Sequence, residues 1–141
     1  MKNLLKYILT FALLAVFSAS YSQSTVSNML SASNGTAIDT VTDAGTKSQV
    51  LQISGFRDVV TIVSTVTEIS GTTAGAVNLY GSVDGTNYAL ITGTFSPADQ
   101  AAAQSHYWSV DPSKFAYYKV VYVGAGTMAA KISSKALVRK R

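Results

Sequence analysis

Aromatic side chains are the residues of this sequence whose chemistry points most directly to a ligand. Exposed tyrosine and tryptophan rings stack on the apolar faces of sugar rings, while neighbouring polar side chains hydrogen-bond to the sugar hydroxyls. The candidate glycan-binding residues are Tyr80, Tyr88, Tyr107 and Trp108. Each of them also suits a core or sheet-packing position, and for any single one of them that structural interpretation is favoured.

Residues for catalysis or metal binding are much scarcer. A Ser-His-Asp hydrolase would depend on His106, the single histidine, and no Gly-x-Ser-x-Gly motif accompanies it. The carboxylates fall mostly at turn and cap positions, and one histidine without any cysteine cannot form a usual zinc site. Asp84, Thr86 and Asn87 offer oxygen ligands for calcium, but without the spacing of a dedicated calcium loop. We therefore expect no enzyme activity, no metal and no cofactor.

The N-terminus has the pattern of a secretory signal peptide. Two lysines precede an apolar run at residues 7–17, and Ser20 and Ser22 fit the −3 and −1 positions of a cut before Gln23. At about 1.5 Å per residue this run is too short to cross a bilayer core of roughly 30 Å. We expect residues 1–22 to be removed, which leaves a secreted or extracellular protein, at the cell surface or in a virion, without membrane contact.

Composition and charge describe one folded domain. The chain has 141 residues, of which 48% are hydrophobic and 13% charged, so it can bury a core, and the absence of cysteine rules out disulfides. The net charge is +4, and the last eleven residues hold five of the basic side chains. Such charges on a strand commonly keep a sheet edge from pairing. No nucleic-acid partner is expected, whereas self-assembly or a contact with a partner protein stays open.

The predicted fold is organised around a hairpin at residues 77–95. Its strands alternate apolar and polar residues, and Asp84-Gly85-Thr86-Asn87 supplies residues that tolerate the positive φ of a tight turn. Residues 59–69 are rich in β-branched side chains and predict a central strand. Further strands are predicted at residues 36–42, 50–56, 106–110, 115–123 and 128–138. Residues 23–35 are polar and predict a flexible leader, and Ser96-Pro97 predicts the start of one short helix.

About eight short strands with regularly spaced turns favour an all-β domain at residues 36–141. The pattern predicts an antiparallel β-sandwich of jelly-roll or galactose-binding-like type. A small up-and-down or Greek-key barrel is the structural alternative.

Two segments carry a resemblance to known sandwiches. Leu79–Ile91 resembles the strand-turn-strand "SxDGxxW/Y" segment of galactose-binding-like (discoidin-type) domains, and Phe115–Val123 is similar to a later aromatic-rich strand of those domains. The same segments resemble small β-sandwich virion or surface proteins of Bacteroidota and their phages. The single tryptophan stands at Trp108 rather than after the turn, so the resemblance implies a scaffold and no binding residue.

These observations lead to two expectations for function. The first is a non-catalytic exported β-sandwich that acts as a surface, matrix or virion structural or adhesion module. The alternative is a carbohydrate-binding module that uses its exposed tyrosine and tryptophan rings, with a glycan as partner.

Overall fold

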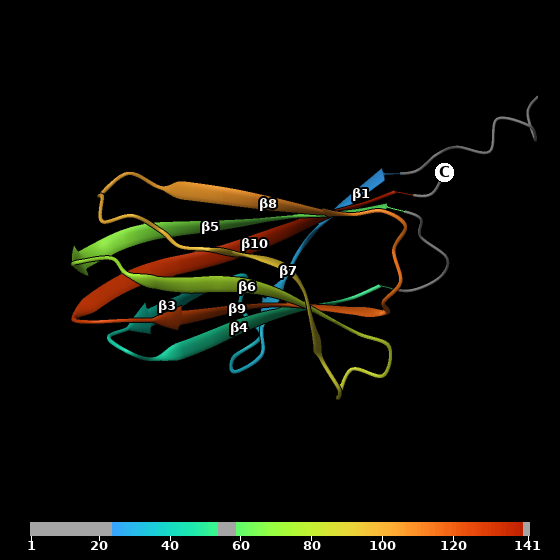
Figure 1. Cartoon of the computed structure of the whole chain (residues 1–141), viewed down its shortest axis with the longest axis horizontal. Coiled ribbons are helices and arrows are strands. Elements are labelled where there is room, and N and C mark those ends of the chain that lie inside the picture. The colour runs from blue at the N-terminus through green and yellow to red at the C-terminus, as the bar shows by residue number, and fades with distance from the viewer. Residues whose placement is uncertain (1–23, 54–58, 140–141) are drawn as a thin grey trace, which may run out of the picture.

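The computed structural model describes residues 24–53 and 59–139, which form ten strands in two antiparallel sheets (Figure 1). In chain order the strands are β1 (Ser24–Asn28), β2 (Leu30–Ser31), β3 (Ile38–Thr42), β4 (Thr46–Gln52), β5 (Val59–Gly71), β6 (Gly75–Ser82), β7 (Ala89–Phe95), β8 (Gln104–Val110), β9 (Tyr117–Gly124) and β10 (Met128–Arg139). The predicted antiparallel β-sandwich is confirmed, because the strands divide into two separate layers instead of closing into a barrel.

Each sheet is built around one long interior pair. In the first, which we call sheet A, β10 pairs with β5 on one side and with both β1 and β3 on the other, and β8 pairs with the far side of β5. The second, sheet B, has the order β2-β4-β9-β6-β7. Figure 1 shows the two layers stacked, with β8, β5 and β10 in one and β6, β9 and β4 in the other.

The long strands alternate in burial as their sequences predict. Along β10, Ile132 and Ala136 are buried between the sheets, whereas Lys131 and Lys135 are exposed. The prediction that residues 128–138 form a strand with an apolar face in the core is confirmed. One part of the interpretation was wrong: β10 has neighbours on both sides, so its basic side chains do not protect a sheet edge.

The core between the sheets is rich in aromatic residues with satisfied polar ends. The Tyr118 hydroxyl lies 2.8 Å from Ser113 Oγ, and the Tyr122 hydroxyl donates to the carbonyl of Ala74 at 3.0 Å. Burial raises the pKa of both phenols. The apolar residues of the core are Met29, Val41, Val60, Ile62, Val66, Val77, Leu79, Trp108, Val110, Tyr118, Val120, Tyr122, Met128, Ala130, Ile132, Ala136 and Val138.

A buried carboxylate joins the two sheets at one edge. Asp39 of β3 accepts hydrogen bonds from Ser31 Oγ of β2 at 2.6 Å and from the Thr40 backbone N–H at 2.8 Å. Lys47 Nζ of β4 lies 3.5 Å from Asp39 Oδ1. Burial by itself would raise the pKa of this carboxyl, but the Ser31 and Thr40 hydrogen bonds and the Lys47 ammonium outweigh it and lower the pKa.

The loop before β8 differs from its prediction. Residues 96–103 contain no helix, so the expectation of one short helix was wrong. Asp99, expected near a helix N-terminus, instead accepts a hydrogen bond from the Thr73 backbone N–H at 2.9 Å. The Gln104 side chain closes the loop, since it accepts from the N–H of Ala98 at 2.7 Å and donates to the carbonyl of Ala98 at 2.6 Å.

The start of the described chain also differs from the predicted flexible leader. Residues 24–28 form β1 against β10, and residues 30–31 form β2 against β4. Between them Met29 is fully buried, and its backbone N–H donates to the carbonyl of Ser134 at 2.9 Å. The flexible leader was predicted from the polar composition of this segment. That composition does not show that β1 and β2 are stabilised by pairing with strands later in the sequence.

Two predicted features fall outside the described residues. They are the signal peptide at residues 1–22 and the end of the strand predicted at residues 50–56. Within the described ranges, the structure contains no helix of the length and apolarity that a membrane span requires.

Candidate functional site

The four aromatic candidates lie in three different places. Tyr80 in β6 and Tyr88 after the hairpin turn lie close together at the outer face of sheet B, where Lys119 contacts both rings. Tyr107 lies on the outer face of sheet A and is 71% exposed. Trp108, the next residue, is only 4% exposed and belongs to the core. The four residues therefore do not form one site, and Trp108 has no ring face open to a ligand.

Trp108 and His106 are both occupied in packing. The Trp108 indole N–H donates to the carbonyl of Gly93 at 3.1 Å. His106 stacks on Phe95 with ring centroids 5.1 Å apart and meets the Trp108 ring edge-on at 4.8 Å. This cluster joins β8 to β7 across the open edge of the sandwich.

The Lys119 ammonium contacts the rings of both Tyr80 and Tyr88 on sheet B. Lys119 Nζ lies 3.8 Å from the ring centroid of Tyr88 and 5.9 Å from that of Tyr80. Both distances are in the range of cation–π attraction. Burial, together with the neighbouring side chains of Tyr117 and Asp84, raises the pKa of the Tyr88 phenol. We call Tyr80, Tyr88 and Lys119 the tyrosine platform.

The hairpin turn fixes the platform from one end. Asp84 accepts hydrogen bonds from the backbone N–H groups of Asn87 and Thr86, both at 2.8 Å, from the Asn87 side-chain amide at 2.7 Å and from the Ser82 hydroxyl at 2.8 Å. These donors, the Asn87 N–H foremost, hold the pKa of the Asp84 carboxyl far below its ordinary value. Because both oxygens of this carboxylate serve the turn, the turn chemistry accounts for the residues considered as calcium ligands.

The platform is the centre of an apolar row that crosses sheet B. The strand register places Lys119 opposite Tyr80 and Val50, and extends the row to Leu30 at one edge and Leu90 at the other. Leu30 in β2 and Leu90 in β7 are 48% and 57% exposed, so the row ends in an exposed leucine at each edge of sheet B.

Polar side chains border this row on both sides. The register places Asn78 and Ser48 in the row on one side, and the Thr94 hydroxyl donates to Asn78 Oδ1 at 2.8 Å. Gln52 is exposed in the row on the other side, where Ser82 is buried and donates to Asp84. A largely apolar strip flanked by amide side chains matches the mixed surface of a sugar, which has apolar ring faces and polar edges.

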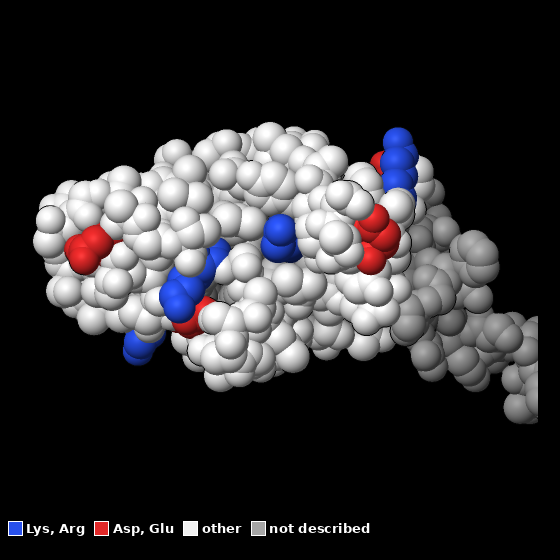
Figure 2. Space-filling model, turned by 90° about the horizontal axis from the view of Figure 1, so that it is seen from below, with Lys and Arg blue, Asp and Glu red and all other residues white. Residues whose placement is uncertain are grey.

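Charged side chains are sparse on the side of the molecule that sheet B forms. Figure 2, which looks at the molecule from this side, shows a few separate charged groups on a largely uncharged surface. A hollow of about 410 Å³ adjoins the β7 end of the row, because Leu90 lines both. Ile91, Lys114 and Phe115 also line the hollow.

No cluster of three or more His, Cys, Asp or Glu side chains with metal-binding geometry occurs among residues 24–53 and 59–139. The sequence pointed to Tyr80 and Tyr88 as candidate residues but not to Lys119. The relevant signal was present in part: Lys119 alternates with Tyr118 and Val120, so it had to face away from the core if they faced inward.

Comparisons with known proteins define a class of fold and no family. No protein-family model and no curated protein matches the sequence. The Yersinia pseudotuberculosis-derived mitogen is 7% identical over 84% of this chain and 86% of its own, with a TM-score of 0.49. The CBM22-1 and GH10 modules of a Clostridium thermocellum endo-1,4-β-D-xylanase are 12% identical over 84% of this chain and 25% of theirs, with a TM-score of 0.49.

Further similar structures include several carbohydrate-binding modules. One is specific for non-crystalline cellulose and is 11% identical over 67% of this chain and 65% of its own, with a TM-score of 0.42. Others are a family 16 carbohydrate-binding module and a prophage-derived protein. The resemblance inferred from Leu79–Ile91 and Phe115–Val123 is confirmed as a β-sandwich resemblance, and it extends no further than the fold.

Proposed function

We propose that this protein is a non-catalytic carbohydrate-binding module that holds a glycan on the outer face of sheet B. The observation that carries the proposal is the tyrosine platform, in which Lys119 contacts the half-buried rings of Tyr80 and Tyr88 in a row whose two ends, Leu30 and Leu90, are exposed. Several proteins of similar fold are carbohydrate-binding modules, but the low TM-scores leave the argument to this chain's own residues.

The geometry favours an extended, uncharged glycan. The row runs across the strands from Leu30 to Leu90, so a sugar chain lying along it would cover five strands and reach the hollow beside β7. Stacking on the apolar row supplies affinity, while the amides and hydroxyls on either side, such as Asn78 and Gln52, fix the orientation of the sugar. Asp84 is occupied by its own turn, so the row itself presents no carboxylate.

Export and surface location belong to the same proposal. A signal peptide at residues 1–22 would place the module outside the cytoplasm, where a polymeric glycan is accessible. A module that binds glycans at a cell surface, in a matrix or on a virion would act in adhesion, which joins the two functions expected from the sequence.

A glycan array followed by calorimetry tests the proposal. We expect binding to one class of neutral glycan, with Tyr80→Ala and Tyr88→Ala each weakening it at least tenfold, about 1.4 kcal/mol. Tyr80→Phe and Tyr88→Phe keep the rings and should retain most of the affinity, which separates stacking from loss of fold. Tyr107→Ala, on the opposite sheet, is the matched control and should bind as the unaltered protein does.

Two results would overturn the proposal. An array without any bound glycan would favour a structural module that assembles with itself or with a partner protein. Neutral-glycan binding that survives both alanine substitutions would place the site elsewhere on the molecule.

A further inference from the structure

Three cations lie on the outer face of sheet A. They belong to β10, which is an interior strand of that sheet. Lys131, Lys135 and Arg139 are exposed and recur every four residues along β10, which spaces them about 13 Å apart. Among the described residues, the single ion pair within 4 Å joins Lys47 to Asp39, so none of the three cations is paired. Since β10 has neighbours on both sides, blocking of strand pairing does not explain them.

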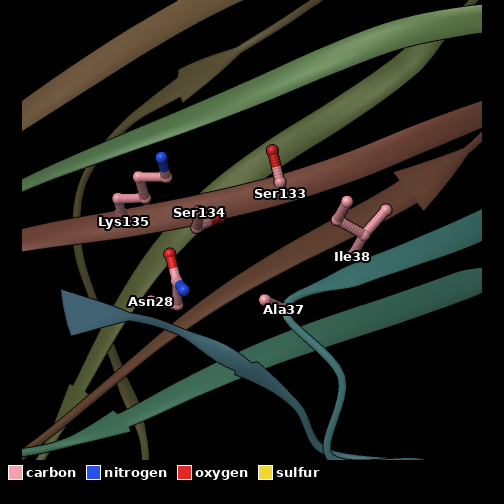
Figure 3. A pocket seen from close by; sticks show the side chains of 6 residues that line it. All are labelled: Asn28, Ala37, Ile38, Ser133, Ser134 and Lys135. Atoms are coloured by element: carbon pink, nitrogen blue, oxygen red, sulfur yellow. The ribbon is translucent and has the colours of Figure 1, made fainter.

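A small cavity, which we call the notch, opens on the outer face of sheet A beside Lys135, the middle one of the three cations. On the side of β10 away from β5, the neighbouring strand changes from β1 to β3. The chain leaves this position after Asn28, where it turns inward to the buried Met29, and a new strand begins at Ile38. The notch has a volume of about 310 Å³ and is lined in part by Asn28, Ile38, Ser133 and Lys135. Figure 3 shows these four side chains rising from the same side of the sheet.

The chemistry of the notch suits a single anionic group. The Lys135 ammonium, the Asn28 carboxamide and the Ser133 hydroxyl all supply hydrogen-bond donors, and the ammonium adds a full charge. The strand register sets Asn28 opposite Lys135 and Ile38 opposite Ser133, so the donors come from adjacent rows. Ile38 is 59% exposed and gives the notch one apolar wall.

An exposed aromatic ring lies in the same row as Lys135. The register continues from Lys135 to Val63 and from Val63 to Tyr107. Tyr107 is therefore two strands away from Lys135, about 10 Å, a separation that a short oligosaccharide spans. Hydroxyls border the row, and those of Thr65 and Ser105 lie 2.8 Å apart.

We propose that the outer face of sheet A binds an acidic polysaccharide, with a carboxylate in the notch at Lys135 and a sugar ring against Tyr107. This site is separate from the tyrosine platform and does not depend on it. The spacing of the cations fits a ligand with fewer charges per unit length than double-stranded DNA, which carries one every ~1.7 Å. The hydroxyl-rich surface and the exposed ring fit a sugar better than an acidic peptide.

The test is calorimetry of the purified protein with polygalacturonate and with its fully methyl-esterified form, which has the same backbone without the charge. We expect the charged polymer to bind, the affinity to fall with added salt, and the ester to bind at least tenfold more weakly. Lys135→Gln should weaken polygalacturonate binding at least tenfold. Lys131→Gln removes the same charge from the same strand outside the notch and should weaken it less than threefold.

Further variants separate this site from the tyrosine platform. Asn28→Ala repeats the test of the notch without altering charge, and Tyr107→Ala should lower the affinity severalfold. Tyr80→Ala should leave polygalacturonate binding unchanged, and Lys135→Gln should leave neutral-glycan binding unchanged. Each proposal can therefore fail while the other stands. Melting temperatures of the variants check that the fold is retained.

Three outcomes would overturn the inference. Equal losses for Lys135→Gln and Lys131→Gln would reduce the effect to general charge. Equal affinity for polygalacturonate and for its methyl ester would show that the carboxylate does not contribute to binding. Tighter binding of duplex DNA or polyglutamate than of polygalacturonate would assign the surface to a nucleic acid or an acidic protein.

Discussion

Replacing Asp39 by Asn tests whether a buried charge helps to hold the sheets together. The substitution preserves shape but removes the charge that strengthens the bonds from Ser31 Oγ and Thr40 N. Hydrogen bonds to charged groups contribute about 1.5 to 3 kcal/mol and neutral ones about 1, and the ion pair with the partly exposed Lys47 adds at most about 1. We expect Asp39→Asn to lower the free energy of unfolding at pH 7 by about 2 kcal/mol.

The pH dependence of this loss follows from the direction of the pKa shift. Folding lowers the pKa of Asp39, so the folded state favours the ionised form. The resulting stabilisation is complete above the unfolded pKa of about 3.9 and disappears as the pH falls through the folded pKa. The difference in unfolding free energy between the unaltered protein and Asp39→Asn should therefore shrink below about pH 4.

Urea unfolding followed by tryptophan fluorescence measures this difference from pH 7 to pH 3. The single tryptophan, Trp108, is buried and reports on loss of the core. Lys47→Gln is the control that removes the ion pair and leaves the carboxylate, and it should cost less than about 1 kcal/mol. Unfolding free energies that differ by a constant amount at every pH would refute the reasoning, because folding would then leave the pKa of Asp39 unchanged.

Two truncations and two substitutions test the packing, each followed by thermal unfolding. Deleting residues 132–141 removes most of β10, the strand that pairs with β5 on one side and with β1 and β3 on the other, and should abolish folding. Deleting residues 139–141 should shift the melting temperature by only a few degrees. Trp108→Phe leaves the Gly93 carbonyl without its donor and opens a void, and should cost about 1 to 3 kcal/mol. Gly85→Val places a β-branched residue at φ +76° and should cost about 1 to 2 kcal/mol, so an unchanged melting temperature would contradict the observed turn.

The parts of the fold that were predicted correctly rest on local signals. The β-branched content of residues 59–69 predicted β5, and the alternation along residues 128–138 predicted β10, because the two-residue period of a strand shows directly in a sequence whose faces differ in polarity. The turn at Asp84 was predicted for a similar reason, since its hydrogen bonds connect residues at most three positions apart.

The mistaken predictions involve partners that are distant in sequence. Strand β1 is polar and is stabilised by β10, more than a hundred residues later, so its composition carried no trace of the pairing. A helix was expected to start at Ser96-Pro97, yet the Asp99 carboxylate in this segment accepts a hydrogen bond from the backbone N–H of Thr73. Asp39 lies within the strand predicted at residues 36–42, but the partners in β2 and β4 that bury its carboxylate could not be predicted.

The candidate site divides in the same way between sequence and tertiary structure. Adjacent residues of a strand point to opposite faces, so the sequence alone determined that Tyr107 and Trp108 could not share a surface. Only the packing of β8 over the core decided that Trp108 is inside and Tyr107 outside. Likewise, Tyr80 and Lys119 are far apart along the chain, and they meet because the register of β6 with β9 places them opposite each other. Register is fixed by the whole buried face of a sheet, which no short stretch of sequence contains.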